Sequence, residues 1–282
     1  MEILLLLSII FGASVQNVIK KYYNKRVGGG VFIFSAVSVI CALIFFIASA
    51  SFPLKFTLQL IPYALGFAAS YCTATVFSFL AIKEGPLSLS SLMTSFSLLI
   101  PTLFGIFFYG DEAGVPFFIG LSLLLCSLVL INLKKEEGIK ITLKWGIYVT
   151  LAFLGNGLCS TVQNGYAKVH NTGKNEFMII ALSVVAVVLI VIALFTEKEK
   201  IAPSIKGGAV LMAICGLANG AVNLFVILLS SLMDASIMFP LISAGGIVLT
   251  SLVAIFLYKE KLSPIQYLGM LLGIGAIVFL NL

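Results

Sequence analysis

The stretch FYGDEAGVPFFIG (residues 108–120) aligns without a gap with LYKEKLSPIQYLG (residues 257–269), at an offset of 149 residues. The alignment pairs a tyrosine with a tyrosine, an acid with an acid and a glycine with a glycine: Tyr109 with Tyr258, Asp111 with Glu260, and Gly120 with Gly269. Chance similarity between two leucine-rich segments would instead match apolar residues in the middle of a helix. These matches at predicted helix ends therefore favour an internal repeat.

A second, shorter block supports the same repeat. Val15-Gln16-Asn17 aligns with Val162-Gln163-Asn164 at an offset of 147 residues. The two blocks occur in the same order and their offsets differ by only two residues. We therefore divide the chain into a first repeat, residues 1–137, and a second repeat, residues 138–282, on either side of the charged stretch 134–144.

Charged residues are scarce and leave long gaps between them. Only 10% of the residues are charged and 61% are hydrophobic, whereas a soluble domain carries about 25% charged residues. Because ~20 helical residues cross a bilayer, gaps of 17 to 28 residues can each span it. The ten gaps are 3–19, 27–54, 56–82, 85–110, 113–133, 145–167, 177–196, 207–233, 235–258 and 262–282. The sequence predicts an all-α integral membrane protein with ten transmembrane helices.

The number of spans in each repeat predicts their relative orientation. Five spans is an odd number, so the second repeat enters the membrane from the opposite side. The predicted fold is therefore two inverted five-helix repeats, an arrangement that many secondary transporters use. Lys and Arg divide 14 to 3 between the two sides. The positive-inside rule then places both termini outside the cytoplasm, in a multi-pass protein of the cell membrane.

Several other functions are disfavoured. The five cysteines all lie in apolar gaps without a CxxC pair, which argues against a metal site and disulfides. The net charge of +6 lies in short loops, where lipid headgroups are better partners than nucleic acid. With one histidine and one arginine, the chain lacks the clustered groups of a membrane-surface enzyme. We expect no enzymatic activity and no cofactor.

The motifs Phe107-Phe-Tyr-Gly-Asp111 and Ile255-Phe-Leu-Tyr-Lys-Glu260, each followed by an apolar helix, resemble the EamA-type drug/metabolite transporter superfamily. The resemblance covers essentially the whole chain. It implies a secondary transporter that moves a small metabolite by alternating access, with helices one, three and four of each repeat around a central cavity. The family typically has Gly-Glu at these turns, where this chain has Gly110-Asp111 and Lys259-Glu260. Many family members are drawn with both termini in the cytoplasm, opposite to the charge-based prediction.

One departure concerns the transported solute. The related small multidrug-resistance proteins carry a membrane-embedded glutamate eight residues before a lysine in their first helix. Counting back from Lys20 or Lys21 reaches Gly12 or Ala13. This argues against proton-coupled export of cationic drugs. Export of cationic drugs or amines, and a channel or lipid flippase, remain the alternative functions.

Uncharged polar residues inside the spans are the candidate binding groups. Asn219 and Asn223 share one helix face, and Asn156 and Gln163 share another. Gln16 is the repeat counterpart of Gln163. The predicted substrate-binding residues are Asn156, Tyr71, Asn219, Asn223, Gln163, Gln16, Ser97 and Ser243.

These groups suit a neutral or zwitterionic solute, amino acid-like or nucleobase-like. Hydrogen bonding between helices is the alternative role for the amides and hydroxyls, and ordinary packing is the alternative for Tyr71. The expected partners are a small-molecule substrate, the lipid bilayer and a coupling proton or counter-substrate, with the protein a monomer or weak homodimer.

Overall fold

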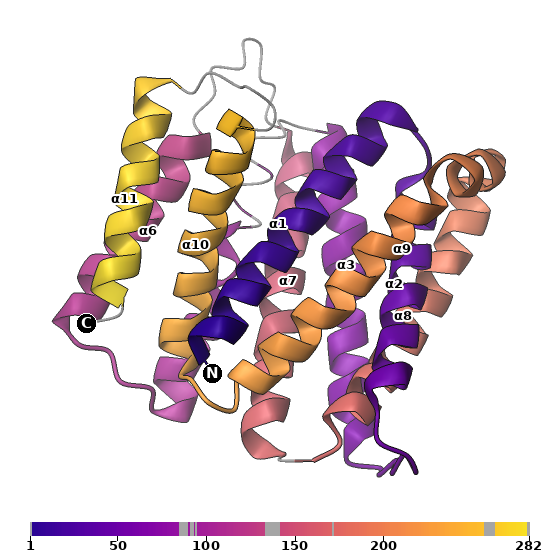
Figure 1. Cartoon of the computed structure of the whole chain (residues 1–282), viewed down its shortest axis with the longest axis horizontal. Coiled ribbons are helices and arrows are strands. Elements are labelled where there is room, and N and C mark those ends of the chain that lie inside the picture. Colours follow the sequence, from indigo (N-terminus) through magenta and orange to yellow (C-terminus); the bar gives the residue numbers. More distant parts are fainter. Residues whose placement is uncertain are drawn as a thin grey trace. The chain divides into compact units, whose positions relative to one another are not determined.

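The computed structural model describes residues 2–84, 90, 93, 95–132, 142–170, 172–256 and 263–280. Every regular element within these ranges is a helix, which confirms the all-helical prediction (Figure 1). The elements are α1 (Glu2–Arg26), α2 (Val31–Ser49), α3 (Leu60–Glu84), α5 (Leu99–Phe104), the π-helix η1 (Gly105–Tyr109), α6 (Val115–Asn132), α7 (Leu143–Val169), α8 (Lys174–Thr196), α9 (Lys198–Leu229), α10 (Ala235–Phe256) and α11 (Pro264–Leu280).

Six helices in the described ranges are long and apolar enough to cross a membrane. They are Glu2–Asn24, Val31–Ser49, Leu60–Ala81, Leu143–Val169, Lys174–Thr196 and Lys198–Leu229. Shorter apolar helices lie in the other four charge-free gaps: Leu99–Tyr109, Val115–Ile131, Ala235–Gly246 and Pro264–Leu280. Helices long and apolar enough to span a membrane are thus present as predicted, while the full number of ten spans stays a prediction.

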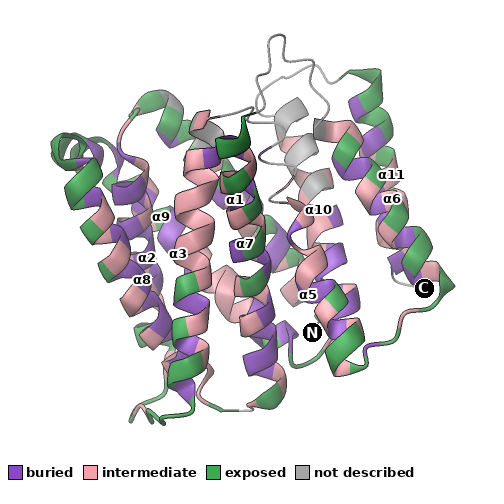
Figure 2. Ribbon diagram, turned by 180° about the vertical axis from the view of Figure 1, so that it is seen from behind, coloured by how far each residue is buried: buried purple, intermediate pink, exposed green. Residues whose placement is uncertain are grey.

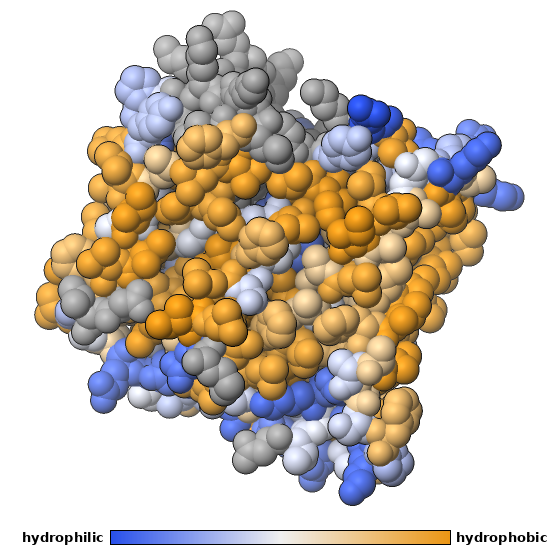
Figure 3. Space-filling view, viewed as in Figure 1, coloured by the Kyte–Doolittle hydropathy of each residue, from blue (hydrophilic) through white to orange (hydrophobic). Residues whose placement is uncertain are grey.

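Large apolar side chains cover much of the outer surface. Phe195 is 87% exposed, Phe107 76% and Val210 71%. The face in Figure 3 is mostly hydrophobic along the helices, and hydrophilic residues gather near helix ends. Soluble proteins rarely expose such large continuous apolar areas, so this surface fits a lipid environment.

The chain divides into two packing units. The first unit comprises Met1–Cys72 and Val162–Ser231, and the second comprises Thr73–Thr161 and Leu232–Leu282. Each unit therefore combines segments of both predicted repeats, and α3 and α7 contribute to both units. Packing units and sequence repeats are different divisions of the chain, so the repeat boundaries stay a prediction.

In the first unit, α2 runs antiparallel to α8. Glu197, directly after α8, accepts hydrogen bonds from backbone N–H groups at the start of α2, and Asn175 Nδ2 at the start of α8 donates to Ser49 O at the end of α2. Helix α9 lies against α2 at Gly220, where an added Cβ would meet Phe45 at 2.8 Å. Figure 2 shows buried residues along α2 and α8. These close contacts give the first unit its core.

A buried carboxylate anchors the α1–α2 loop in this unit. Glu197 Oε1 accepts from Val31 N at 2.8 Å, while Oε2 accepts from Phe32 N at 2.9 Å and Ile33 N at 3.0 Å. Gly30 N donates to Ser204 Oγ at 2.8 Å. The first N–H groups of a helix have no partner within the helix and attract negative charge. Glu197 therefore caps α2 from a distant part of the chain.

In the second unit, α6 and α11 run antiparallel in close contact. An added Cβ at Gly120 would meet Leu280 Cγ at 2.8 Å, and one at Gly269 would meet Ile131 Cγ1 at 2.8 Å. Ser127 Oγ donates to Gly269 O at 2.6 Å. Glycine at these two positions lets the helix backbones approach closely.

The first motif tyrosine ends the π-helix η1. Gly110 follows with a φ of 70°, a left-handed conformation that glycine adopts without strain. Asp111 Oδ2 then accepts from Ser236 N at 3.1 Å, at the start of α10. The counterparts in the second repeat, residues 257–262, lie outside the described residues.

Candidate functional site

Four of the predicted residues form one hydrogen-bonded chain in the first unit. Asn219 Nδ2 on α9 donates to Gln16 Oε1 on α1 at 3.1 Å. One turn further along α9, Asn223 Nδ2 donates to Asn219 Oδ1 at 3.0 Å and to Asn219 O at 2.9 Å. Gln163 Nε2 on α7 donates to Asn223 O at 2.8 Å. This amide chain, Gln16–Asn219–Asn223–Gln163, links three helices.

Burial differs along the amide chain. Gln16 and Gln163 are buried, at 6% and 4% exposure, whereas Asn219 and Asn223 are half-buried. Asn219 lies near the middle of the charge-free gap 207–233. The two asparagines thus lie near the middle of a predicted span and are still partly accessible to a small molecule.

The amide chain has unused hydrogen-bonding capacity. Gln16 Nε2, Gln163 Oε1 and Asn223 Oδ1 make no hydrogen bond with any other described residue. The hydrogen bonds between the helices leave these three atoms unused. A solute reaching them would find both a donor and acceptors.

Two further predicted residues pair in the second unit. Asn156 Nδ2 on α7 donates to Ser97 Oγ at 2.6 Å, and Ser97 is fully buried. Gly157 beside Asn156 lets Ile100 approach α7 closely. For Ser97, the observed geometry matches the alternative role as a contact between helices.

The remaining two predicted residues have other surroundings. The ring of Tyr71 stacks on Phe67 in the first unit, with centroids 5.8 Å apart and planes at 28°. Ser243 lines a hollow in the second unit, with Thr102, Ser95 and apolar residues around it. The structure therefore joins the eight predicted residues into an amide chain of four and a pair, with Tyr71 and Ser243 in separate settings within their units.

Two buried polar groups of the first unit were missed by the sequence prediction. Ser14 Oγ and Asn164 Nδ2 are buried, at 5% and 1% residue exposure, and have no hydrogen-bond partner among the described residues. Asn164 directly follows Gln163 in the repeated Val-Gln-Asn block. That block could have identified it as a candidate, whereas Ser14 carries no comparable signal.

An aromatic group at one end of α7 was also missed. His170 stacks on Tyr166 with centroids 4.9 Å apart and meets Tyr63 edge-on at 5.4 Å. Tyr166 in turn stacks on Phe177, with centroids 4.4 Å apart and planes at 12°. These rings hold α3, α7 and α8 together in the first unit.

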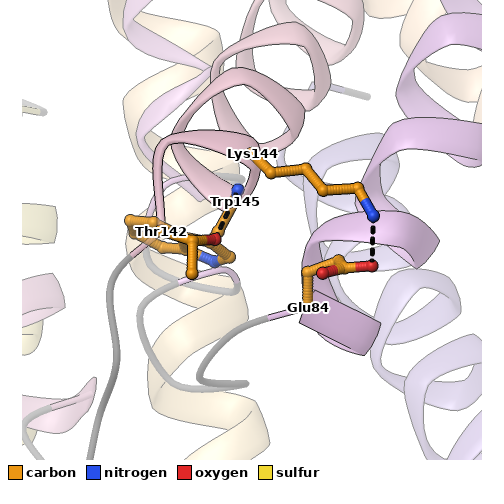
Figure 4. A network of polar contacts seen from close by, with 4 residues as sticks. All are labelled: Glu84, Thr142, Lys144 and Trp145. Atoms are coloured by element: carbon orange, nitrogen blue, oxygen red, sulfur yellow. Dashed lines mark hydrogen bonds and ion pairs between the residues drawn. The ribbon is translucent and has the colours of Figure 1, made fainter.

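Polar contacts join α3 to the start of α7 in the second unit (Figure 4). Lys144 Nζ donates to Glu84 Oε1 at 2.8 Å, and Trp145 N donates to Thr142 Oγ1 at 3.1 Å. The Lys144 side chain is 58% exposed and that of Glu84 31%, so solvent screens this ion pair. It links the end of α3 to the start of α7.

No metal centre is evident in the part of the chain that the structure describes. Within those ranges, no group of three or more His, Cys, Asp or Glu side chains is placed to hold an ion. The groups that the amide chain presents are uncharged side-chain amides.

The comparisons with known proteins identify the fold alone. No family model and no curated protein matches the chain. A solved structure, described only as a crystal structure of a protein, matches with a TM-score of 0.76 and 15% identity, covering 98% of both chains. An agreement of this extent shows that the whole helical fold occurs in another protein.

Proposed function

We propose that this protein is a secondary transporter of the EamA type, which moves a small neutral or zwitterionic metabolite across the cell membrane by alternating access. The observation that carries the proposal is the amide chain Gln16–Asn219–Asn223–Gln163. It places hydrogen-bonding groups without charge within apolar helices.

The energetics of polar groups in lipid favour a binding role for this chain. Burying an amide in an apolar medium without a hydrogen-bond partner costs a few kcal/mol of free energy. If these amides served only to join helices, we would expect every donor and acceptor on them to have a partner. Here a donor on Gln16 and acceptors on Gln163 and Asn223 have no partner among the described residues. Water or a solute then supplies the missing bonds.

Contacts within each unit support the inverted repeats that alternating access requires. Helix α2 is the second helix of the first repeat and α8 the second helix of the second repeat, and the two pack antiparallel to each other. Helices α6 and α11, the last helices of the two repeats, also pack antiparallel to each other. Reciprocal contacts between two matched elements are the mark of a two-fold relation.

In the α6–α11 pair the reciprocity is residue by residue. Gly120 meets Leu280, and its counterpart Gly269 meets Ile131. Leu280 is itself the counterpart of Ile131 at the same offset of 149 residues. We take the ten helices to be five plus five, with a binding site near the bilayer midplane.

Counterflow in proteoliposomes tests the proposal. Vesicles loaded with an unlabelled solute should accumulate the same labelled solute transiently, and the rate should saturate with concentration. A panel of nucleobases, amino acids and polyamines covers the neutral, zwitterionic and cationic classes. Non-saturating flux would indicate a channel, and no flux of any panel member would contradict the proposal.

A further inference from the structure

Exposed cations surround the α1–α2 loop, residues 27–30, of the first unit. Residues 20–26 carry four Lys or Arg and no acid, and residues 197–206 carry three lysines and two acids. The cations of these two segments whose side chains the structure describes are all exposed: Lys20, Arg26, Lys198, Lys200 and Lys206. We call these five side chains the basic rim.

Contacts of the loop bring the two segments together. Val27 follows the last cation of α1, and Gly207 follows the last lysine of residues 197–206. An added Cβ at Gly207 would lie 3.2 Å from Val27 Cγ1. Gly30 N also donates to Ser204 Oγ at 2.8 Å. Segments far apart in the sequence therefore present their cations at the same end of the first unit.

The two acids of this region offset little of the positive charge. Glu197 is buried, and both of its carboxylate oxygens accept backbone N–H groups at the start of α2. Its negative charge is thus directed at a helix N-terminus, which attracts it. Glu199 is exposed beside the cations. The accessible surface around the loop is therefore positively charged.

The basic rim lies where the apolar surface of these helices ends. The charge-free gap 3–19 ends directly before Lys20, and the gap 207–233 begins directly after Lys206. Helix α9 has 32 residues, which makes it about 48 Å long, longer than a hydrocarbon thickness of ~30 Å. Its first turns therefore reach the level of the lipid headgroups.

Exposed apolar side chains adjoin the basic rim. Leu194 and Phe195 at the end of α8 are exposed, and so is Val210 on α9. Figure 3 shows hydrophilic residues where α9 begins and a hydrophobic surface further along the helices. Arg26 Cζ also lies 5.5 Å from the centroid of the Tyr22 ring, and tyrosine is enriched at membrane interfaces. Cations and lipid-facing apolar groups thus meet at one place.

We infer that the basic rim binds the headgroup of an anionic phospholipid, whose acyl chains lie along the exposed apolar side chains of α8 and α9. The argument is charge complementarity, because clustered cations at a membrane surface attract lipids with a net negative charge. A zwitterionic phospholipid offers the same acyl chains without that charge. The inference concerns a lipid partner and does not depend on the transport function.

Thermal unfolding of the full chain in a neutral detergent tests the inference. Phosphatidylglycerol, which has one negative charge, is compared with phosphatidylcholine of the same acyl chains, and the Tm difference between the two lipids is measured within each variant. At a phosphatidylglycerol concentration a hundredfold above its Kd, binding should raise Tm by about 5 °C. Equal Tm values in the two lipids would overturn the inference.

Variants with opposite expected effects locate the site. Arg26→Gln combined with Lys206→Gln should raise the Kd for phosphatidylglycerol roughly tenfold or more, since two of the attracting charges are lost. Glu199→Gln removes the exposed acid and should lower the Kd. Lys55→Gln, at an exposed cation in the loop between α2 and α3, is the matched control and should leave the Kd within twofold.

Each variant can contradict the assignment by itself. An unchanged Kd in the double variant, or an equal rise in Lys55→Gln, would show that the basic rim is not the site. A higher Kd in Glu199→Gln would contradict the electrostatic argument, and this arm stands even where the double variant fails to fold.

Discussion

Replacing Glu197 by glutamine tests whether a distant carboxylate holds the start of α2. Glu197 is 8% exposed and accepts three backbone N–H bonds from Val31, Phe32 and Ile33. A glutamine of the same shape keeps one acceptor oxygen. Its NH2 group then faces a backbone N–H that it cannot satisfy, and the negative charge at the helix N-terminus is lost.

The magnitude follows from these contacts. A hydrogen bond to a charged group contributes about 1.5–3 kcal/mol, and a charge at a helix N-terminus about 0.3–1 kcal/mol. Losing one such bond and the charge should destabilise the protein by about 2–4 kcal/mol. For 282 residues, an unfolding entropy of ~2.1 cal/mol/K per residue converts this to a fall in Tm of about 3–7 °C.

Thermal unfolding in a mild detergent, followed by fluorescence or light scattering, provides the assay. Glu199→Gln is the matched control, because Glu199 lies two residues further on and is exposed. The control should change Tm by less than about 1 °C, since exposed substitutions usually alter stability by under ~0.5 kcal/mol. Equal Tm values for the two variants would refute the capping role of Glu197.

Two further predictions concern packing and topology. Gly269→Ala should lower the free energy of unfolding by about 1–3 kcal/mol, because its Cβ would overlap Ile131. Gly146→Ala is the control and should not lower the free energy of unfolding, because the space around Gly146 is open. Equal Tm values for the two variants would show that α6 and α11 do not need to approach closely. Both termini should face away from the cytoplasm. A cysteine at position 2 should therefore react with a membrane-impermeant maleimide in intact cells, and a cysteine in the 134–144 loop should not react. The reverse labelling pattern would overturn this orientation.

The local helices were largely predictable, because length and the absence of charge define a membrane-spanning segment almost independently of its neighbours. The gaps 27–54 and 177–196 correspond to α2 and α8 in this way. The role of Glu197 was not predictable. It lies in the charged run EKEK (residues 197–200), which is typical of a solvated loop, and it becomes buried only because α2 brings unpaired N–H groups to it.

The candidate site was predictable in its residue types but not in its connections. An amide in a charge-free span is conspicuous, which identified Gln16, Asn219, Asn223 and Gln163. Which amide donates to which depends on how α1, α7 and α9 pack, and helical spacing within one segment contains no such information. The same reasoning explains Ser97, which was predicted as a binding residue while its bond to Asn156 was not predicted.

The most direct measurement of the central claim is the KM for counterflow of the transported solute in Asn219→Ala, compared with Asn17→Ala. Asn219 belongs to the amide chain, whereas Asn17 is an exposed amide next to Gln16. Loss of one neutral hydrogen bond costs about 0.5–1.5 kcal/mol, so Asn219→Ala should raise KM roughly three- to twelvefold. Asn17→Ala should leave KM unchanged within twofold. If both variants transport with the unmodified KM, the amide chain is a contact between helices and does not bind the solute.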